Sequence, residues 1–487
     1  MKNVIIFLII LASTLNALAQ NKIIYWVHGL GGDRSTWGQA ADATQLDFTR
    51  TDLLNNSYQP YKVYSNRLDY STSNGSLETA GNDVKNFILT ADNAYKGHPE
   101  YNIDYTKSFS IGHSLGGLVL RKVDQKYDLI NPNSKCFHGI VTFATPHAGT
   151  ALLTPETKQI YVPNYIQSAC TELTIGPAEE LQNNLVGDAG FLKGLLIDNI
   201  LNQDKVEKIV NALCSAAAIF LPKFIAPLNL PITNDFYAYP GNTQVASSAL
   251  TNLNYVTSSL PKVAFYGVEE SGSELWRLIS SSSTTVPTSN DYFVDPTADG
   301  DILDFKNRKM AMYLMKRDLY NNLYHAGGPG NIADRWLKLR NYWGRGVNFW
   351  NNANDSWLRI IGANYEIPIS TPGFDCNCTQ YDYDGFPVSN WSYQVTDPSQ
   401  CVGQGNSNFT DCSTSPTTIY DFTVVHEPND GAVTKTSALA FPGIDLNNTQ
   451  SMINSNHSQL TNDANTRDRL KELFFGYYGK FFMTTNR

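Results

Sequence analysis

The sequence predicts an α/β protein. Three apolar runs typical of buried strands each end in a short turn that contains glycine, and a helix-like segment follows the second turn at once. The runs lie at 23–27, 109–111 and 139–144. The turns at these strand ends carry the residues from which a function can be argued.

The turn after the second run is the pentapeptide Gly-His-Ser-Leu-Gly at 112–116. A serine at a sharp strand-to-helix turn needs neighbours without bulky side chains, because the strained backbone packs close to an adjacent strand and helix. Gly112 and Gly116 meet that need, and the N-terminus of the following helix offers a positive dipole end to a developing oxyanion. The pattern indicates Ser114 as a nucleophile, although so short a match also arises by chance.

Glycine-containing turns also close the first and third runs. The first run ends in His-Gly-Leu-Gly-Gly at 28–32, a loop of the H-G-x-G type whose backbone N–H groups can face a ligand. The third run ends in Thr-Pro-His-Ala-Gly at 145–149, where it suits a sheet edge near an active site. Each segment, taken alone, also fits a strand that simply ends in a turn.

In this order, the three motifs resemble those of the α/β-hydrolase superfamily, in particular secreted bacterial lipases and the related inositol-lipid deacylases. The resemblance covers about Lys22–Leu153 and resumes near Asp421. It implies an α/β-hydrolase fold, with a mostly parallel central sheet, helices on both faces and two large insertions. It also implies that the backbone N–H groups of Leu30 and Leu115 form the oxyanion hole and that no cofactor is required.

The catalytic base should follow the serine, because the triad order in this superfamily is nucleophile, acid, histidine. His457 lies in a polar loop after a short strand candidate, as the family's base does; an ordinary solvated loop histidine is the alternative. His426 ends the strand candidate 422–425 and precedes the acid, which is the wrong order.

Asp430 is the preferred acid, because Asn-Asp-Gly-Ala-Val at 429–433 matches the turn on which these lipases carry their aspartate. An ordinary Asn/Asp/Gly turn would have the same composition. Glu269 and Glu270 are the alternative acids, since they directly follow the strand candidate 263–267, where many hydrolases place the acid.

With 487 residues, two to three domains would fit, but motifs at both ends of the chain favour one core with two insertions. The first insertion contains the apolar run 216–221 and would be either a lid that meets acyl chains or a packed cap. We expect these segments: signal peptide 1–19, first core part 20–150, cap or lid 151–261, core strand 262–270, second insertion 271–420 and C-terminal core part 421–487.

One acidic loop is a candidate calcium site. Asp295, Asp299 and Asp301 surround a glycine turn and could hold Ca²⁺, but the distal glutamate of an EF-hand is missing and a solvated acidic loop is the simpler interpretation. Some bacterial lipases carry a calcium-binding aspartate two residues after the catalytic histidine, and here that place is Gln459.

Cysteines suggest an oxidising compartment. Four of them crowd one polar segment and should form two local disulfide bonds of open connectivity, with a metal site as the alternative; they are Cys376, Cys378, Cys401 and Cys412. Cys170 is a candidate partner of Cys214, which would leave Cys136 as the odd thiol.

The N-terminus reads as a signal peptide, with a short basic start, an apolar stretch and small residues before a cut near Ala19/Gln20. No later apolar stretch is long enough to span a membrane, so we expect an exported protein without a transmembrane span. The net charge of −9, with scattered basic residues, argues against nucleic acid as a partner.

The sequence therefore predicts a secreted, lipase-like serine hydrolase that forms an acyl-enzyme. Its partner would be a lipid or other acyl ester, met in solution or at an interface. Two alternatives stay open: an acyltransferase or amidase with the same triad, and a non-catalytic binding protein with this fold.

Overall fold

The structure is a computed structural model, and it describes residues 21–43, 63–72, 75–98, 102–130, 135, 137–188, 227–239, 246–269, 272–283, 293–296, 300–402 and 409–484. The chain divides into two compact units. Unit 1 contains 1–363 and 427–487, and unit 2 contains Asn364–His426. The predicted signal peptide and its cleavage position lie outside the described residues.

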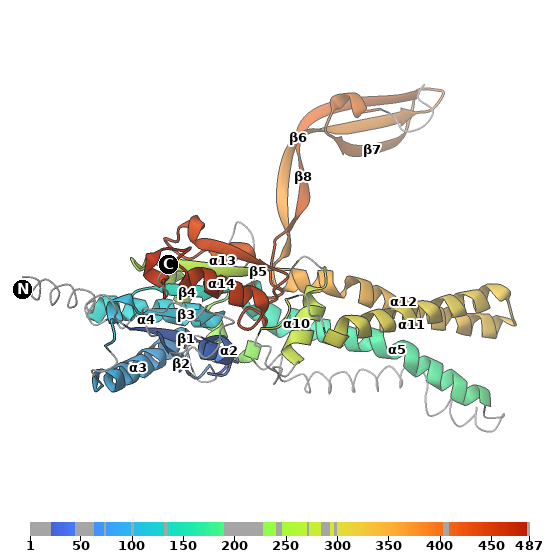
Figure 1. Cartoon of the computed structure of the whole chain (residues 1–487). Coiled ribbons are helices and arrows are strands. Elements are labelled where there is room, and N and C mark those ends of the chain that lie inside the picture. Colours follow the sequence, from blue (N-terminus) through green and yellow to red (C-terminus); the bar gives the residue numbers. More distant parts are fainter. Residues whose placement is uncertain are drawn as a thin grey trace, which may run out of the picture. The chain divides into compact units, whose positions relative to one another are not determined.

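A parallel six-stranded sheet forms the centre of unit 1 (Figure 1). Its order is β2-β1-β3-β4-β5-β9, so the chain starts in the sheet interior and leaves it toward both edges. The strands are β1 (Lys22–Val27), β2 (Val63–Leu68), β3 (Phe109–His113), β4 (Ile140–Phe143), β5 (Lys262–Val268) and β9 (Thr449–Ile453). All carboxyl ends of the strands therefore meet at one edge of the sheet, where parallel α/β folds place their ligands.

Helices cover both faces of this sheet. On one face, α3 (Leu77–Lys96) and α4 (Leu115–Ile130) pack with Ile23, Tyr25 and Val27 of β1 in one hydrophobic cluster. On the other face, α2 (Gly38–Ala43) and α14 (Ala464–Phe474) pack with Ile24 and Trp26. Because successive strand residues point to opposite faces, β1 needs an unbroken apolar sequence to fill both layers. This arrangement confirms the predicted α/β-hydrolase fold.

Most of the other described helices of unit 1 lie between β4 and β6. A third apolar cluster joins Tyr313, Trp343 and Trp350, with Leu173 packed against it. These residues lie in three long helices, 162–188, 300–326 and 330–360, which Figure 1 shows. The helices are α5 (Val162–Asp188), α9 (Ser248–Asn254), α10 (Glu274–Ser283), α11 (Gly300–Ala326), α12 (Gly330–Ile360) and the short α13 (Lys435–Leu439). None of the described helices combines the length and apolar character that a membrane span requires.

Unit 2 is an antiparallel three-stranded sheet in the order β7-β6-β8. Its strands are β6 (Asn364–Tyr381), β7 (Pro387–Val395) and β8 (Thr410–His426). Disulfide bonds join Cys376 to Cys401 and Cys378 to Cys412. The four clustered cysteines thus form two local bridges, and the structure gives their connectivity.

The observed units divide the chain differently from the expected segments in two places. β8 pairs with β6 along its full length, so residues 421–426, expected in the C-terminal core part, lie in unit 2. The helices α10–α12, expected in the second insertion, lie in unit 1. Cys170 is disulfide-bonded, whereas its predicted partner Cys214 and the expected odd thiol Cys136 lie outside the described residues.

Candidate active site

Ser114 occupies the turn between β3 and α4 with a backbone φ of +52°. Its N–H donates to the carbonyl oxygen of Phe143 at 2.9 Å, which ties the turn to the end of β4. A non-glycine residue in this region stores about 1–3 kcal/mol of strain and persists only where its surroundings impose it. The strained strand-to-helix turn is the geometry expected of a nucleophile elbow.

The two flanking glycines are required by close backbone contacts. A Cβ at Gly112 would lie 2.7 Å from the backbone nitrogen of Gly117. A Cβ at Gly116 would lie 2.6 Å from the carbonyl oxygen of Val27 and closer still to that of His28. Any larger residue would force the backbone to shift, so the glycine spacing follows from packing.

The loop after β1 runs beside the serine. A Cβ added at Gly29 would lie 2.8 Å from Cβ of Ser114. The hydroxyl of Tyr70 donates to the carbonyl oxygen of His28 at 2.9 Å, and the indole of Trp37 donates to that of Val27 at the same distance, so side chains from two other segments hold this loop.

Leu30 lies in this loop and Leu115 is the first residue of α4. Among the backbone hydrogen bonds of turns and loops in the described part of the chain, none has the N–H of Leu30 or of Leu115 as its donor. The N–H of Leu115 is also one of the first four of its helix, which have no partner inside the helix.

His457 lies between Ser114 and Asp430. Its Nε2 is 3.0 Å from Oγ of Ser114, and its Nδ1 is 2.8 Å from Oδ2 of Asp430. The carboxylate can only accept, so Nδ1 carries the proton and Nε2 is free to accept from the serine hydroxyl. The backbone N–H of His457 also donates to the carbonyl oxygen of Asp430 at 2.8 Å. Ser114, His457 and Asp430 are thus joined by two consecutive hydrogen bonds, although Ser114 lies far from the other two in the sequence.

Asp430 is held by its own turn. Its Oδ1 accepts from the backbone N–H groups of Ala432 at 3.0 Å and Val433 at 2.7 Å, which leaves Oδ2 for the histidine. The indole of Trp357 in α12 donates to the carbonyl oxygen of Gly431, whose φ is +90°. The Asn-Asp-Gly sequence suits this turn because aspartate accepts from nearby N–H groups and glycine adopts positive φ at no steric cost.

His113 contacts the backbone of the proposed base. Its Nε2 donates to the carbonyl oxygen of His457 at 2.9 Å. Burial, with the charge of His457 adding to it, lowers the pKa of His113 to about 3, so this imidazole is neutral at ordinary pH. A neutral histidine here adds no positive charge that would oppose the imidazolium form of its neighbour.

The side chains of the two alternative candidates that the structure describes have other partners. Glu269 is buried directly after β5 and contacts Arg277; burial raises the pKa of its carboxyl group, and the Arg277 guanidinium opposes that shift. His426 belongs to unit 2, where its Nδ1 is 2.8 Å from the amide oxygen of Asn364. Glu270 lies outside the described residues.

The weak calcium candidates are only partly described. Asp295 is exposed, Asp301 lies in α11, and Asp299 falls outside the described residues. Gln459 is buried near Arg277, with its Oε1 3.5 Å from a guanidinium nitrogen. Among the described residues, the one cluster of potential metal-ligating groups is formed by the four cysteines of unit 2, which are paired in disulfides.

Sequence reasoning missed His113 and Arg277. The histidine lies inside the serine motif, but its motif position is variable and no spacing points to the contact with His457. Arg277 lies in a helix of mixed polarity and contacts Gln459, 182 residues further along the chain. No local pattern could have shown that contact.

Comparisons with known proteins agree with the fold and the motifs. Residues 19–213 match the model of the family described as "Putative serine esterase (DUF676)". A search of curated proteins gives no match. Together with the sheet and the elbow, the family match supports a hydrolase of the α/β-hydrolase superfamily, which is the class that the sequence motifs resemble.

Several solved structures are similar to parts of the chain. Phospholipase PlaB from Legionella pneumophila shares 19% identity with a TM-score of 0.21, over 28% of this chain and 27% of that one. An extracellular α/β-hydrolase from a Paenibacillus species shares 15% identity with a TM-score of 0.23, over 50% and 77%. The thioesterase RedJ from Streptomyces coelicolor shares 11% identity with a TM-score of 0.22, over 52% and 70%. The chain thus spans 27% of the phospholipase's length.

Proposed function

We propose that this protein is an exported serine hydrolase that cleaves carboxylic esters of lipids through an acyl-enzyme on Ser114. The observation that carries the proposal is the chain of two hydrogen bonds, of 3.0 and 2.8 Å, from Ser114 through His457 to Asp430. A serine hydroxyl is a weak nucleophile unless a positioned base accepts its proton. The strained turn at Ser114 and the family match to serine esterases support the same proposal.

In the first half of the reaction, Oγ of Ser114 attacks the ester carbonyl carbon while Nε2 of His457 accepts its proton. Asp430 stabilises the imidazolium that forms and keeps the ring in the required tautomer. The N–H groups of Leu30 and Leu115 would bind the developing oxyanion; losing one such donor typically costs about 100- to 1000-fold in turnover. The imidazolium then protonates the leaving alcohol.

In the second half, water attacks the acyl carbon and His457 accepts its proton. Collapse of the second oxyanion releases the carboxylic acid, and Ser114 regains its proton from the imidazolium. The mechanism uses side chains and backbone N–H groups of this chain, so the proposal assigns no step to a cofactor or to calcium.

Ester hydrolysis by the wild type and by Ser114→Ala tests the reaction. Assays with a soluble short-chain ester, an emulsified acylglycerol, phospholipid vesicles and an amide would identify the substrate class, and analysis with added alcohol or amine acceptors would reveal acyl transfer. We expect free acid as the main product and no turnover by the variant. A folded variant, judged by circular dichroism, that retains turnover would contradict the proposal.

Export is the second part of the proposal. The two disulfide bonds of unit 2 are typical of proteins that mature in an oxidising compartment. We expect the N-terminus of the secreted form to lie near Gln20, as measured by mass spectrometry of the culture medium or the periplasmic fraction. A secreted form that still begins at Met1 would contradict a cleaved signal peptide.

A further inference from the structure

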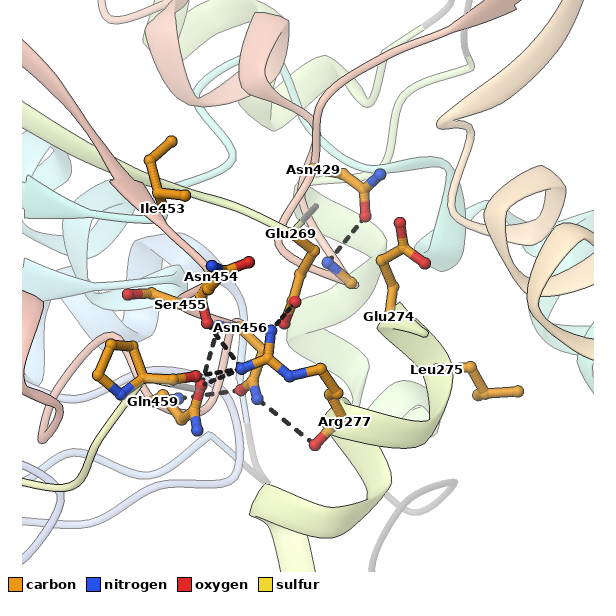
Figure 2. A network of polar contacts seen from close by, with 12 residues as sticks. Glu269, Glu274, Leu275, Arg277, Asn429, Ile453, Asn454, Ser455, Asn456 and Gln459 are labelled. Atoms are coloured by element: carbon orange, nitrogen blue, oxygen red, sulfur yellow. Dashed lines mark hydrogen bonds and ion pairs between the residues drawn. The ribbon is translucent and has the colours of Figure 1, made fainter. Parts of the chain in front are cut away.

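A buried arginine contacts the loop that carries the proposed base and a glutamate beside the segment that carries the proposed acid (Figure 2). Arg277 projects from α10 and donates from Nη1 to the carboxylate of Glu269. Its Nη2 donates to the carbonyl oxygens of Pro296 and of Asn454, the latter at 2.7 Å, and lies 3.5 Å from Oε1 of Gln459. One guanidinium thus contacts oxygen atoms of four residues, which come from three segments of the chain.

Two of these oxygens belong to the histidine loop, which we define as residues 454–459. Asn454 lies three residues before His457 and Gln459 two residues after it, so the arginine contacts both ends of the loop. Inside the loop, the N–H of Asn456 donates to Oε1 of Gln459 at 3.2 Å, and its side chain donates back to the carbonyl oxygen of Arg277 at 3.4 Å. The loop therefore contacts both the side chain and the backbone of the arginine.

The same arginine is connected to the acid turn. Its partner Glu269 donates a backbone hydrogen bond of 2.8 Å to the carbonyl oxygen of Asn429, the residue before Asp430. The side-chain oxygen of Asn429 accepts from the N–H of Gly431 at 2.9 Å and so shapes the turn around Asp430. Through Glu269 and the histidine loop, Arg277 links the positions of acid and base.

The chemistry of the guanidinium suits this task. It is always charged and presents its N–H groups in a rigid plane, so several oxygen acceptors can be held at fixed angles by one side chain. A lysine offers a single mobile ammonium group and cannot reproduce these directions. The arginine is 2% exposed, and a buried charge of this kind is stable only when oxygens surround it.

We propose that Arg277 is a positioning residue, whose guanidinium holds the histidine loop so that His457 stays aligned between Asp430 and Ser114. The inference rests on the proposed function and deepens it. Arg277 acts through the loop, so its loss should lower the rate of proton transfer from Ser114 and leave substrate affinity almost unchanged. A displacement of the ring by about 1 Å costs on the order of 100-fold in rate.

The test compares Arg277→Ala and Arg277→Lys with the wild type in ester turnover and in the rate at which a serine-reactive phosphonate labels the protein. We expect kcat and the labelling rate of Arg277→Ala to fall together by about 10- to 100-fold, with KM changed less than about twofold. Guanidinium chloride, at concentrations well below denaturing, should restore part of both rates in Arg277→Ala. Arg277→Lys should retain more activity than Arg277→Ala.

A matched control removes another buried charge pair. Nζ of Lys135 lies 2.7 Å from the carboxylate of Asp124, and both side chains are almost fully buried in unit 1. Lys135→Met should lower the melting temperature and keep the wild-type kcat and labelling rate. If Arg277→Ala lost activity only because a buried ion pair is missing, Lys135→Met would lose activity as well.

The outcomes separate the two proposals. A wild type that neither turns over esters nor reacts with the phosphonate would contradict the proposed function. A wild type that reacts, together with folded Arg277 variants that react equally fast, would overturn the positioning role. If Arg277→Ala does not fold, Arg277→Lys and Glu269→Gln give the same decision: a lowered melting temperature with unchanged kcat overturns the inference.

Discussion

Close contacts between backbone segments fix the position of Ser114 in the proposed site, whereas hydrogen bonds from polar side chains fix the positions of His457 and Asp430. At the serine, glycines allow β3, α4 and the loop after β1 to approach so closely that a single Cβ would collide with a neighbouring backbone. At the histidine, the loop bonds to Arg277 and His113, and the acid turn bonds to Glu269 and Trp357.

Because of this difference, mutations on the two sides should have different effects: loss of stability at the serine and loss of activity at the histidine and acid. Steric packing of the backbone depends on how closely a few segments approach one another, and its disruption affects folding. A polar network depends on groups from distant segments, and the loss of one member can displace a reacting atom while the core stays packed.

The largest expected effect is at the acid. Asp430→Asn should lower turnover on the order of 10⁴-fold, because the amide favours the wrong imidazole tautomer and no longer stabilises the imidazolium. Glu269→Gln should lower it far less, since Glu269 acts through Arg277. Steady-state kinetics of both variants measure this. Near wild-type rates in Asp430→Asn beside an inactive Glu269→Gln would reverse the assignment of the acid.

A steric change at the serine side should act on stability. Gly116→Ala places a Cβ against the carbonyl oxygens of Val27 and His28, and we expect it to destabilise the fold by about 1–3 kcal/mol. Gly344→Ala in α12 is the control, because its Cβ would lie 3.9 Å from the nearest atom; it should be neutral or stabilise by up to about 1 kcal/mol. Urea unfolding measures both. Equal stability of the two variants would disprove the steric account.

Stability should also depend on pH through His113. Its pKa is about 3 in the folded protein and about 6.5 when unfolded, so between these values the unfolded chain alone binds this proton. The contribution of His113 is complete above pH 6.5 and is lost as the pH falls toward 3, by about 1.4 kcal/mol per pH unit.

Glutamine in His113→Gln keeps a donor for the carbonyl oxygen of His457 but does not titrate. The variant should therefore lose the part of the pH dependence of the unfolding free energy that His113 contributes. The free energy of unfolding, measured from pH 7 to pH 4, checks it. Burial also lowers the pKa of His147, so part of the slope persists in the variant. Identical slopes in both proteins would show that His113 is protonated in the folded state.

The smallest expected effect on the reaction comes from unit 2. Replacing Cys378 and Cys412 by serine removes one disulfide of that sheet and should cost about 2–5 kcal/mol of its local stability. The triad lies entirely in unit 1, so turnover of a soluble ester should stay unchanged. Limited proteolysis and kinetics on the same preparation measure the two effects. A parallel loss of turnover would mean that unit 2 supports the site.

The predictable part of the site is the part that packing dictates locally. The glycines at 112 and 116 and the apolar runs before them are consequences of a sharp turn and a doubly covered sheet, so the elbow and the fold class could be predicted. The Asn-Asp-Gly turn could also be predicted from the local sequence, because its residues form hydrogen bonds with one another.

What could not be predicted depends on partners far apart in the sequence. Residues 422–425 have the composition of a strand, but Phe422 and Val424 are exposed in unit 2, and composition does not tell which sheet a strand joins. The side chain of Glu269 suits a catalytic acid in sequence, yet it contacts Arg277 once the chain is folded.

Mass spectrometry of the phosphonate-treated protein tests the central claim most directly. We expect a single adduct on the peptide that contains Ser114, formed rapidly in the wild type, slowly in Asp430→Asn and not at all in Ser114→Ala. An active protein whose adduct maps to another residue, or that turns over esters without forming any adduct, would contradict the proposal that Ser114 is the nucleophile.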